Sequence, residues 1–280
     1  SSMSAARWGG RAVKEPVAVG ATSPERPLSV GLLMSWPGDS GTDPDDEVIG
    51  GLATGVLGCG LVYCAGDHDN GWRAGHWALG AGLFGMGVLI DEGGDDTYEL
   101  RSMGQGAAYF GAGLLLDADG NDRYLLREGD GQGWGAPGGI GILADRRGDD
   151  RYYAEPDAAK AGRGDYHSKD AVAVSNAQGV GSGRRGDGSD GHSWAGGLGA
   201  LIDVDGHDRY RAGNFSQGLV LWLGSGLLLD GGCDDEYVSV YFTQGSGAHF
   251  AVGALIDESG DDRHILLENA GAAFGFGWDV

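Results

Sequence analysis

The sequence predicts an all-β protein, a parallel β-solenoid of about eight coils with roughly 27 residues in each coil. A short acidic phrase recurs at a nearly constant spacing, and glycine makes up 58 of the 280 residues. The segments between these phrases are short aliphatic runs broken by glycine, without helical periodicity. A constant period of this length is typical of architectures in which each repeat packs only on its neighbours.

Each copy of the repeat begins with an aliphatic run that ends at an aspartate. The following turn reads DEGGDDTY from Asp91, DADGNDRY from Asp117 and DVDGHDRY from Asp203. The full set of run-ending aspartates is Asp91, Asp117, Asp145, Asp203, Asp230 and Asp257. Neighbours lie 26 to 28 residues apart, except for one gap of 58. Two degenerate copies precede the series, with Cys64 and Ser35 at the equivalent position.

The aliphatic run is the first expected strand of each coil. In runs such as MGVLI at 86–90 and SGLLL at 225–229, both faces of the strand would carry small or apolar side chains. Strands that are buried on both faces have this composition. We therefore expect either a second layer over this side of the solenoid or an apolar surface used for assembly.

A glutamine followed by glycine comes about seven residues after the aromatic residue of each copy. The series is Gln105, Gln132, Gln178, Gln217 and Gln244. Equivalent positions of stacked coils lie above one another, so we expect these amides to form a ladder that bonds from coil to coil. The alternative is that each glutamine fills a turn.

A second aspartate follows five residues after the first, and stacking would place these side chains in a column. The column comprises Asp96, Asp122, Asp150, Asp208, Asp235 and Asp262. Two carboxylates about 5 Å apart repel by roughly 3 kcal/mol at an effective dielectric constant near 20. Three kinds of compensation are open. A divalent cation can bind between coils, the following arginines can pair with the carboxylates, or the carboxylates can accept backbone N–H groups of the turn. Those arginines are Arg123, Arg151, Arg209 and Arg263.

The pattern Gly-x-Asp-x-Tyr, as in GNDRY at 120–124 and GDDRY at 148–152, resembles half of the calcium-binding nonapeptide of RTX β-roll proteins. The resemblance covers about five residues per coil. It implies that the aspartate binds Ca²⁺ and that the aromatic residue belongs to the core. The period near 27, the aspartate at the start and Cys233 in place of a turn glycine depart from that family. The candidate calcium ligands are Asp91, Asp96, Asp117, Asp122, Asp145, Asp150, Asp203, Asp208, Asp230, Asp235, Asp257 and Asp262.

The gap of 58 residues indicates one coil that carries two insertions. Tyr152 stands at its expected place, but Gln178 follows it by 26 residues instead of seven or eight. The stretch from Gln178 to the next run-ending aspartate is also about twice the usual length. We expect insertions near 154–172 and 181–192, within a single solenoid over 29–280 that follows an N-terminal extension over 1–28.

Insertions in solenoids often map to one binding face, and these two are rich in basic residues. We predict a recognition site for an acidic ligand or partner, formed by Arg163, Asp165, Tyr166, His167, Lys169, Arg184, Arg185 and His192. The alternatives are loops without a role, and catalysis with His167 or Tyr166 as general base.

The composition limits the possible partners. With a formal net charge of −22 and a pI near 4.4, the chain repels nucleic acids and anionic membranes. Its longest apolar stretch, 77–90, is too short to span a bilayer. The last copy stops at GFGWDV, so we expect a protein partner or self-assembly through the solenoid end or the apolar face.

These observations favour a non-enzymatic protein from a bacterial surface or secreted setting. We expect a Ca²⁺-stabilised solenoid that acts as a scaffold or recognition subunit. The alternative is a polysaccharide lyase or hydrolase whose active site lies on the inserted loops.

Overall fold

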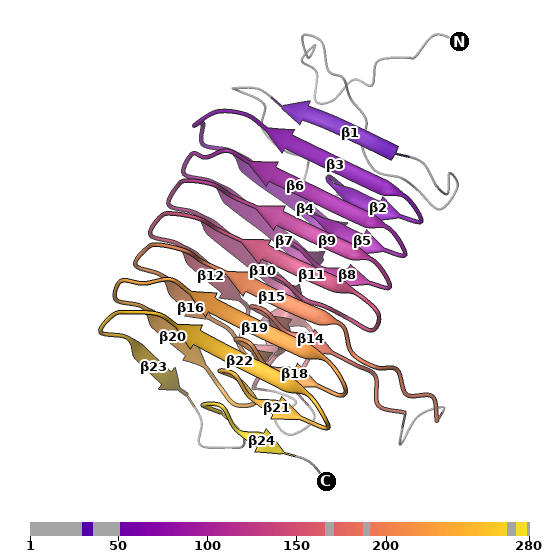
Figure 1. Cartoon of the computed structure of the whole chain (residues 1–280), viewed down its shortest axis with the longest axis vertical. Helices are drawn as coiled ribbons and strands as arrows, with labels where there is room; N and C mark the ends of the chain where they lie inside the picture. The colour runs from indigo at the N-terminus through magenta and orange to yellow at the C-terminus, as the bar shows by residue number, and fades with distance from the viewer. Residues whose placement is uncertain (1–29, 36–50, 166–170, 187–190, 268–272, 279–280) are drawn as a thin grey trace.

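The predicted fold class is confirmed. In the computed structural model the chain winds into an all-β parallel solenoid of about 8 turns, about 27 residues apart, and its coils stack along the long axis (Figure 1). The residues described by the structure are 30–35, 51–165, 171–186, 191–267 and 273–278. The expected extension over 1–28 lies outside these residues.

The aliphatic runs form one continuous parallel sheet, here called sheet A. Its strands, in spatial order, are β1 (Val30–Ser35), β3 (Cys59–Cys64), β6 (Met86–Asp91), β9 (Ala112–Leu116), β11 (Ile140–Ala144), β15 (Leu198–Ile202), β19 (Ser225–Asp230) and β22 (Val252–Asp257). The register follows the repeat, since Asp230 pairs with Asp257 and Cys64 pairs with both Asp91 and Ser35. The two degenerate copies therefore stand where the spacing places them.

The strands that follow the acidic turns form sheet C on a second side. They are β4 (Gly71–Ala78), β7 (Thr97–Gly104), β10 (Arg123–Gly131), β12 (Arg151–Ala154), β16 (Arg209–Arg211), β20 (Glu236–Ser239) and β23 (Arg263–Leu266), together with β13 (Val174–Ala177) and β17 (Asn214–Ser216).

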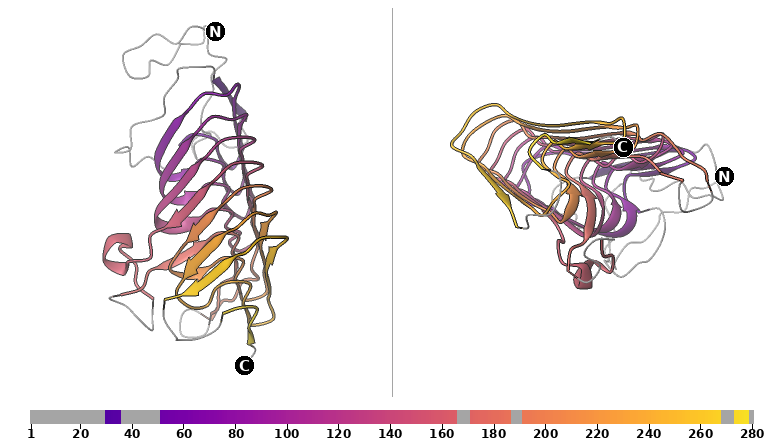
Figure 2. Two further views of the ribbon diagram at one scale, coloured as in Figure 1. Left: turned by 90° about the vertical axis from the view of Figure 1, so that its left-hand side faces the viewer. Right: turned by 90° about the horizontal axis from the view of Figure 1, so that it is seen from below.

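Short strands on the third side, sheet B, return the chain to sheet A. One group holds β2 (Thr54–Val56), β5 (Ala81–Leu83) and β8 (Ala108–Tyr109), and another holds β14 (Gly181–Ser182), β18 (Val220–Leu221), β21 (Gly247–Ala248) and β24 (Gly277–Trp278). The view along the axis shows how the coils enclose a narrow interior (Figure 2).

Two longer connections interrupt the coil that contains β12. Residues 155–173 join β12 to β13 and include the short helix α1 (Ala158–Ala161), which begins after Asp157 and ends at Gly162. Residues 183–197 join β14 to β15. The first connection therefore leaves sheet C, and the second runs between sheets B and A.

The core consists of columns of similar side chains. The stacked tyrosines Tyr98, Tyr124, Tyr152, Tyr210 and Tyr237 have ring centroids 4.8 to 5.0 Å apart and are fully buried. His264 continues the stack beyond Tyr237. A second column holds Val62, Leu89, Leu115, Leu143, Leu201 and Leu228, each with at most 1% exposure. The aromatic residue of each repeat is thus a core residue.

Crowding between coils explains the glycine in the acidic turn. Gly120 and Gly148 have φ angles of 151° and 139°. A Cβ atom on Gly148 would lie 1.5 Å from the carbonyl oxygen of Gly120 in the preceding coil, so no side chain fits there. Cys233 takes the equivalent place at a φ of 75°, a different backbone conformation.

The glutamines bond from coil to coil, but the expected amide-to-amide ladder is wrong. The Nε2 of Gln105 donates to the backbone oxygen of Tyr98 in its own coil and of Leu125 in the next. Gln132 repeats this with Tyr124 and Tyr153. The glutamine backbone is left-handed, with φ near 50° for Gln105. In this conformation the side-chain amide donates to backbone carbonyls and not to the amide of the next glutamine.

Candidate metal sites at an interior corner

Both aspartates of the repeat face the interior, at the corner between sheets A and C. The first aspartate ends a sheet A strand, and alternation along the strand turns it inward with the core leucines. The second directly precedes a sheet C strand and lies two residues before the buried tyrosine. Apart from Asp257 and Asp262 of the last acidic turn, these side chains have at most 2% exposure.

In four coils the first aspartate accepts a hydrogen bond from the tyrosine of the coil before it. The Tyr124 hydroxyl donates to Asp145 at 2.5 Å, and the Tyr152 hydroxyl donates to Asp203 at 2.6 Å. The other Asp145 oxygen accepts the backbone N–H of Arg147 at 3.1 Å. The tyrosine–aspartate bonds link successive coils inside the buried core, where a hydrogen bond to a charged group is strong.

The second aspartate has one bonded and one unpartnered oxygen. Its Oδ1 accepts the N–H of its counterpart one coil earlier, as Asp150 does from Asp122 at 2.6 Å and Asp208 does from Asp150 at 2.7 Å. Its Oδ2 is buried and has no hydrogen-bond partner in Asp122, Asp150, Asp208 and Asp235. A buried carboxylate oxygen without a partner lowers the stability of the folded state unless a proton or a cation binds to it.

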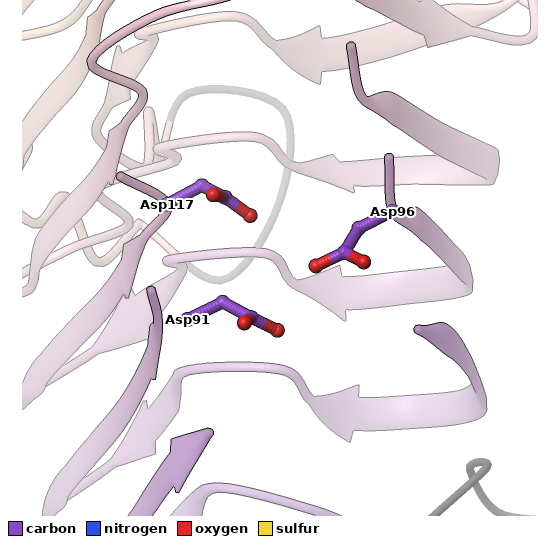
Figure 3. Close-up of side chains that lie close together, drawn as sticks. All are labelled: Asp91, Asp96 and Asp117. Carbon is purple, nitrogen blue, oxygen red and sulfur yellow. The ribbon is translucent and has the colours of Figure 1, made fainter. Parts of the chain in front are cut away.

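The described carboxylates form five clusters of three, in which one oxygen from each residue lies within 4.8 Å of the others. Figure 3 shows the first cluster, where Asp91 and Asp117 of successive coils face Asp96. The other clusters are Asp122–Asp145–Asp150, Asp150–Asp203–Asp208, Asp208–Asp230–Asp235 and Asp235–Asp257–Asp262. All twelve candidate ligands therefore occur in groups that can hold a metal ion.

Burial and mutual repulsion raise the pKa values of ten of these twelve carboxyl groups. Burial, followed by the charge of Asp117, raises the pKa of Asp122 to about 11, and burial beside Asp145 raises the pKa of Asp150 to about 11. The pKa of Asp145 rises to about 7 because burial and the charges of Asp203 and Asp117 outweigh its hydrogen bonds. Without a cation, the second aspartates with raised pKa values are therefore protonated at neutral pH, namely Asp96, Asp122, Asp150, Asp208 and Asp235.

Arginine pairing, one of the three compensations open from the sequence, does not occur among the described residues of this corner. Arg123, Arg151 and Arg209 are exposed, because each lies one position after an inward aspartate and points away from it. Arg263 pairs with Glu236 on the outer face. Backbone N–H groups do bond the carboxylates, but they engage only one oxygen of each second aspartate.

The donor set suits calcium. Calcium takes six to eight oxygen ligands at about 2.3–2.6 Å, so opposite ligands stand up to about 5 Å apart. Three carboxylates offer up to six oxygens, and the Tyr98 hydroxyl lies within 3.3 Å of carboxylate oxygens of Asp91, Asp96 and Asp117. Zinc prefers histidine and cysteine ligands, which these clusters lack.

The sequence missed a second ladder, on the outer side of the same turn. The residue before each second aspartate accepts the N–H of its counterpart in the following coil. Asp95 accepts from Asn121, Asn121 from Asp149, and Asp149 from His207, at 2.9 to 3.1 Å. The near-constant Asx residue at this position was the available signal.

The residues predicted for recognition stand in two different surroundings. Arg163 pairs with Asp130 at 2.5 Å, and buried Asp165 accepts a hydrogen bond from Tyr241, so both hold the first connection to the coils. In the second connection, Arg184 lies over Trp194, Arg185 lies over Trp222 and near His249, and His192 is exposed. Tyr166, His167 and Lys169 lie outside the described residues.

Comparisons with known proteins identified no relative of this chain. A scan against protein-family models, a search of curated proteins and a search of solved structures each found no match to this chain. Within the described ranges, the structure has no helix of the length and apolarity needed to cross a membrane.

Proposed function

We propose that the protein is a non-enzymatic, calcium-stabilised β-solenoid that works outside the cell as a scaffold or recognition subunit. The observation that supports this proposal most directly is the row of buried Oδ2 atoms on the second aspartates. These atoms have no hydrogen-bond partner, and each lies beside further carboxylates. Five divalent cations, one in each cluster, would offset ten of the 22 excess negative charges. Extracellular calcium modules bind in the range of about 10⁻⁴ to 10⁻³ M, which suits an extracellular setting.

Protons and calcium compete for the same oxygens. When Asp150 is protonated, its Oδ2 can donate to a neighbouring carboxylate, which satisfies the oxygen without a cation. Calcium binding requires the ionised form and therefore releases these protons. Because the raised pKa values lie between about 6 and 11, calcium should displace protons across the neutral range and stabilise the coils more as the pH rises.

We prefer this function to a polysaccharide-active enzyme because the unusual chemistry of the described residues lies inside the coils. A polymer cannot reach carboxylates with at most 2% exposure. The direct test is thermal melting with calcium and with chelator, with magnesium at equal ionic strength as the reference.

We also propose that the outer face of sheet A binds a second copy of the chain. The outward side chains of its described strands carry no charge: Cys59, Leu61, Tyr63, Met86, Val88, Ile90, Ala112, Leu114, Leu116, Ile140, Ile142, Ala144, Leu198, Ala200, Ile202, Ser225, Leu227, Leu229, Val252, Ala254 and Ile256. Several of the large ones are exposed, with Ile140 at 49% and Val252 at 71%. No described segment lies over this face (Figures 1 and 2).

The size of the face supports a stable pair. Seven strands at about 4.8 Å and five residues at about 3.3 Å give about 550 Å² for each copy. The total of about 1,100 Å² exceeds the roughly 1,000 Å² expected of a biological interface. A heavily acidic chain repels its own copies elsewhere, so a charge-free face is where two copies can meet.

Charge at the two edges of the face favours one orientation of this pair. The strands end at the acidic turns, while their starting edge borders the exposed side chains of Phe84, Leu223 and Phe250. A two-fold axis parallel to the solenoid axis lays the acidic edge of each copy over the apolar edge of the other. The perpendicular axis within the face would bring the two acidic edges together.

A further inference from the structure

The outer face of sheet C carries a row of four arginines that form no ion pair with any described residue. Arg123, Arg151 and Arg209 are strand neighbours in register, and Arg211 lies one outward position further along β16. All four side chains are exposed. Successive coils are about 4.8 Å apart, as the ring spacing of Tyr152 shows, so the guanidinium groups are held close enough to repel one another.

Other arginines on the same face are paired. Arg127 bonds Glu99 at 2.9 Å, Arg101 bonds Glu128 at 2.7 Å and Arg263 lies 3.6 Å from Glu236. None of the four arginines in the row forms an ion pair with a described residue. Unpaired cations are conspicuous in a chain with 41 acidic and only 19 basic residues.

The acidic outer ladder also weakens beside this row. In most coils an aspartate occupies the outward position of the turn, but Asn121 stands next to Arg123 and His207 next to Arg209. Only Asp149, near Arg151, keeps its charge in these coils. The arginine row therefore has fewer acidic neighbours in its turns than the other coils have.

The row lines a groove of about 480 Å³. Leu125, Tyr153 and Val238 form part of its lining together with the four arginines, and Glu236 is an acidic lining residue that lies 3.6 Å from Arg263. The side chains of Leu125 and Tyr153 are half-buried, and Tyr153 is held by a 3.0 Å hydrogen bond to Glu155. An aromatic face beside arginine forks is suited to a flat ligand that carries carboxylate or sulfate groups.

We propose that this groove binds an acidic polysaccharide, laid along the solenoid axis across β10, β12 and β16. A polymer with a negative charge on each sugar can meet arginines repeated once per coil, and its ring faces can pack on Tyr153. Nucleic acid fits less well, because single strands bind through several stacking aromatics and, of the aromatic residues that line the groove, only Tyr153 is not fully buried. The proposal does not depend on the metal sites.

The test is titration calorimetry with hexagalacturonate as probe and its fully methyl-esterified form as the neutral reference. Measurements at pH 6 with chelator, where a carboxylate probe cannot be bridged to the protein by calcium, are repeated with saturating calcium. We expect the charged probe alone to bind in both conditions. An oligothymidylate of equal charge should bind more weakly.

Two variants locate the binding. Arg151→Ala combined with Arg209→Ala should weaken hexagalacturonate binding by at least about tenfold. Arg101→Ala on the same face, whose arginine is already paired with Glu128, should change it less than about twofold. Absence of binding, equal binding of the neutral ester, equal loss in the Arg101 variant, or tighter binding of the oligothymidylate would each overturn the proposal.

Discussion

The hydroxyl of Tyr152 donates a 2.6 Å hydrogen bond to Oδ2 of Asp203, which belongs to the next coil. The tyrosine ring stacks on its counterparts at 4.8 Å on both sides. One residue type therefore joins successive coils in two ways, through the apolar column and through the carboxylate column.

Removing the Tyr152 hydroxyl should destabilise the folded state even though the stack of aromatic rings is kept. In Tyr152→Phe, Asp203 loses a hydrogen-bond donor within a dry interior, which should lower the free energy of unfolding by about 1–3 kcal/mol. Tyr153→Phe is the matched control, since its hydroxyl bonds Glu155 on the outer, half-buried side. Urea unfolding of both variants measures the difference, and a larger loss in the control would contradict the proposed coupling.

The turn glycine should tolerate no side chain. Gly148→Ala brings a Cβ within 1.5 Å of a carbonyl oxygen at a φ of 139°, and we expect a loss of more than about 3 kcal/mol. Gly162→Ala provides the control, because that glycine also has a positive φ, 70°, but no atom within 4 Å of the added Cβ. Its cost should stay near 1 kcal/mol. Similar costs at both positions would show that coil crowding is not the cause.

Without calcium, stability should fall as the pH rises. The pKa of Asp145 is raised to about 7 and that of Asp208 to about 10, so the folded state holds protons that the unfolded chain loses above about pH 4. The stabilising contribution is complete below the unfolded pKa and is lost as the pH passes through the folded values. We expect the melting temperature of the chelated protein to decrease steadily from pH 5 to pH 9. A flat or rising profile would contradict the raised pKa values.

The assembly proposal predicts a dimer of twice 28.8 kDa that one outward charge disrupts. Leu114→Lys, in the centre of the sheet A face, should give monomers in light scattering because the interface cannot bury an unpaired ammonium group. Leu125→Lys, a half-buried outward leucine on sheet C, should leave the mass unchanged. A monomeric parent protein, or equal effects of the two substitutions, would end the proposal.

The sequence predicted those features that follow directly from stacking. The period placed Ser35, Cys64 and the aspartates in one register, and the alternation of side chains placed Asp and Tyr together in the interior. The same alternation also directs Arg123 outward, away from the carboxylates with which the sequence allowed it to pair. The glutamine partners could not be foreseen, because they depend on a left-handed backbone at Gln105 that no spacing reveals.

The repeat pattern could not predict the contacts of the two insertions either. Arg163 pairs with Asp130 and Asp165 bonds Tyr241, and these partners are 33 and 76 residues away in the chain. A periodic pattern carries no information about a segment that departs from it. The apolar face, in contrast, was visible in the aliphatic runs, because small or apolar residues occupy both sides of each strand.

The calcium proposal is tested most directly by Asp150→Asn, with Asp149→Asn as the matched exposed control in the same turn. At pH 8 with saturating calcium, each filled site should raise the melting temperature of the parent protein by roughly 5–10 °C over the chelated state. Asp150→Asn removes a ligand shared by two clusters, and should reduce this increment while leaving the chelated protein as stable or more stable. Asp149→Asn should keep the full increment. A parent protein whose melting temperature responds to calcium no more than to magnesium, or an Asp150→Asn variant with an undiminished response, would contradict the account.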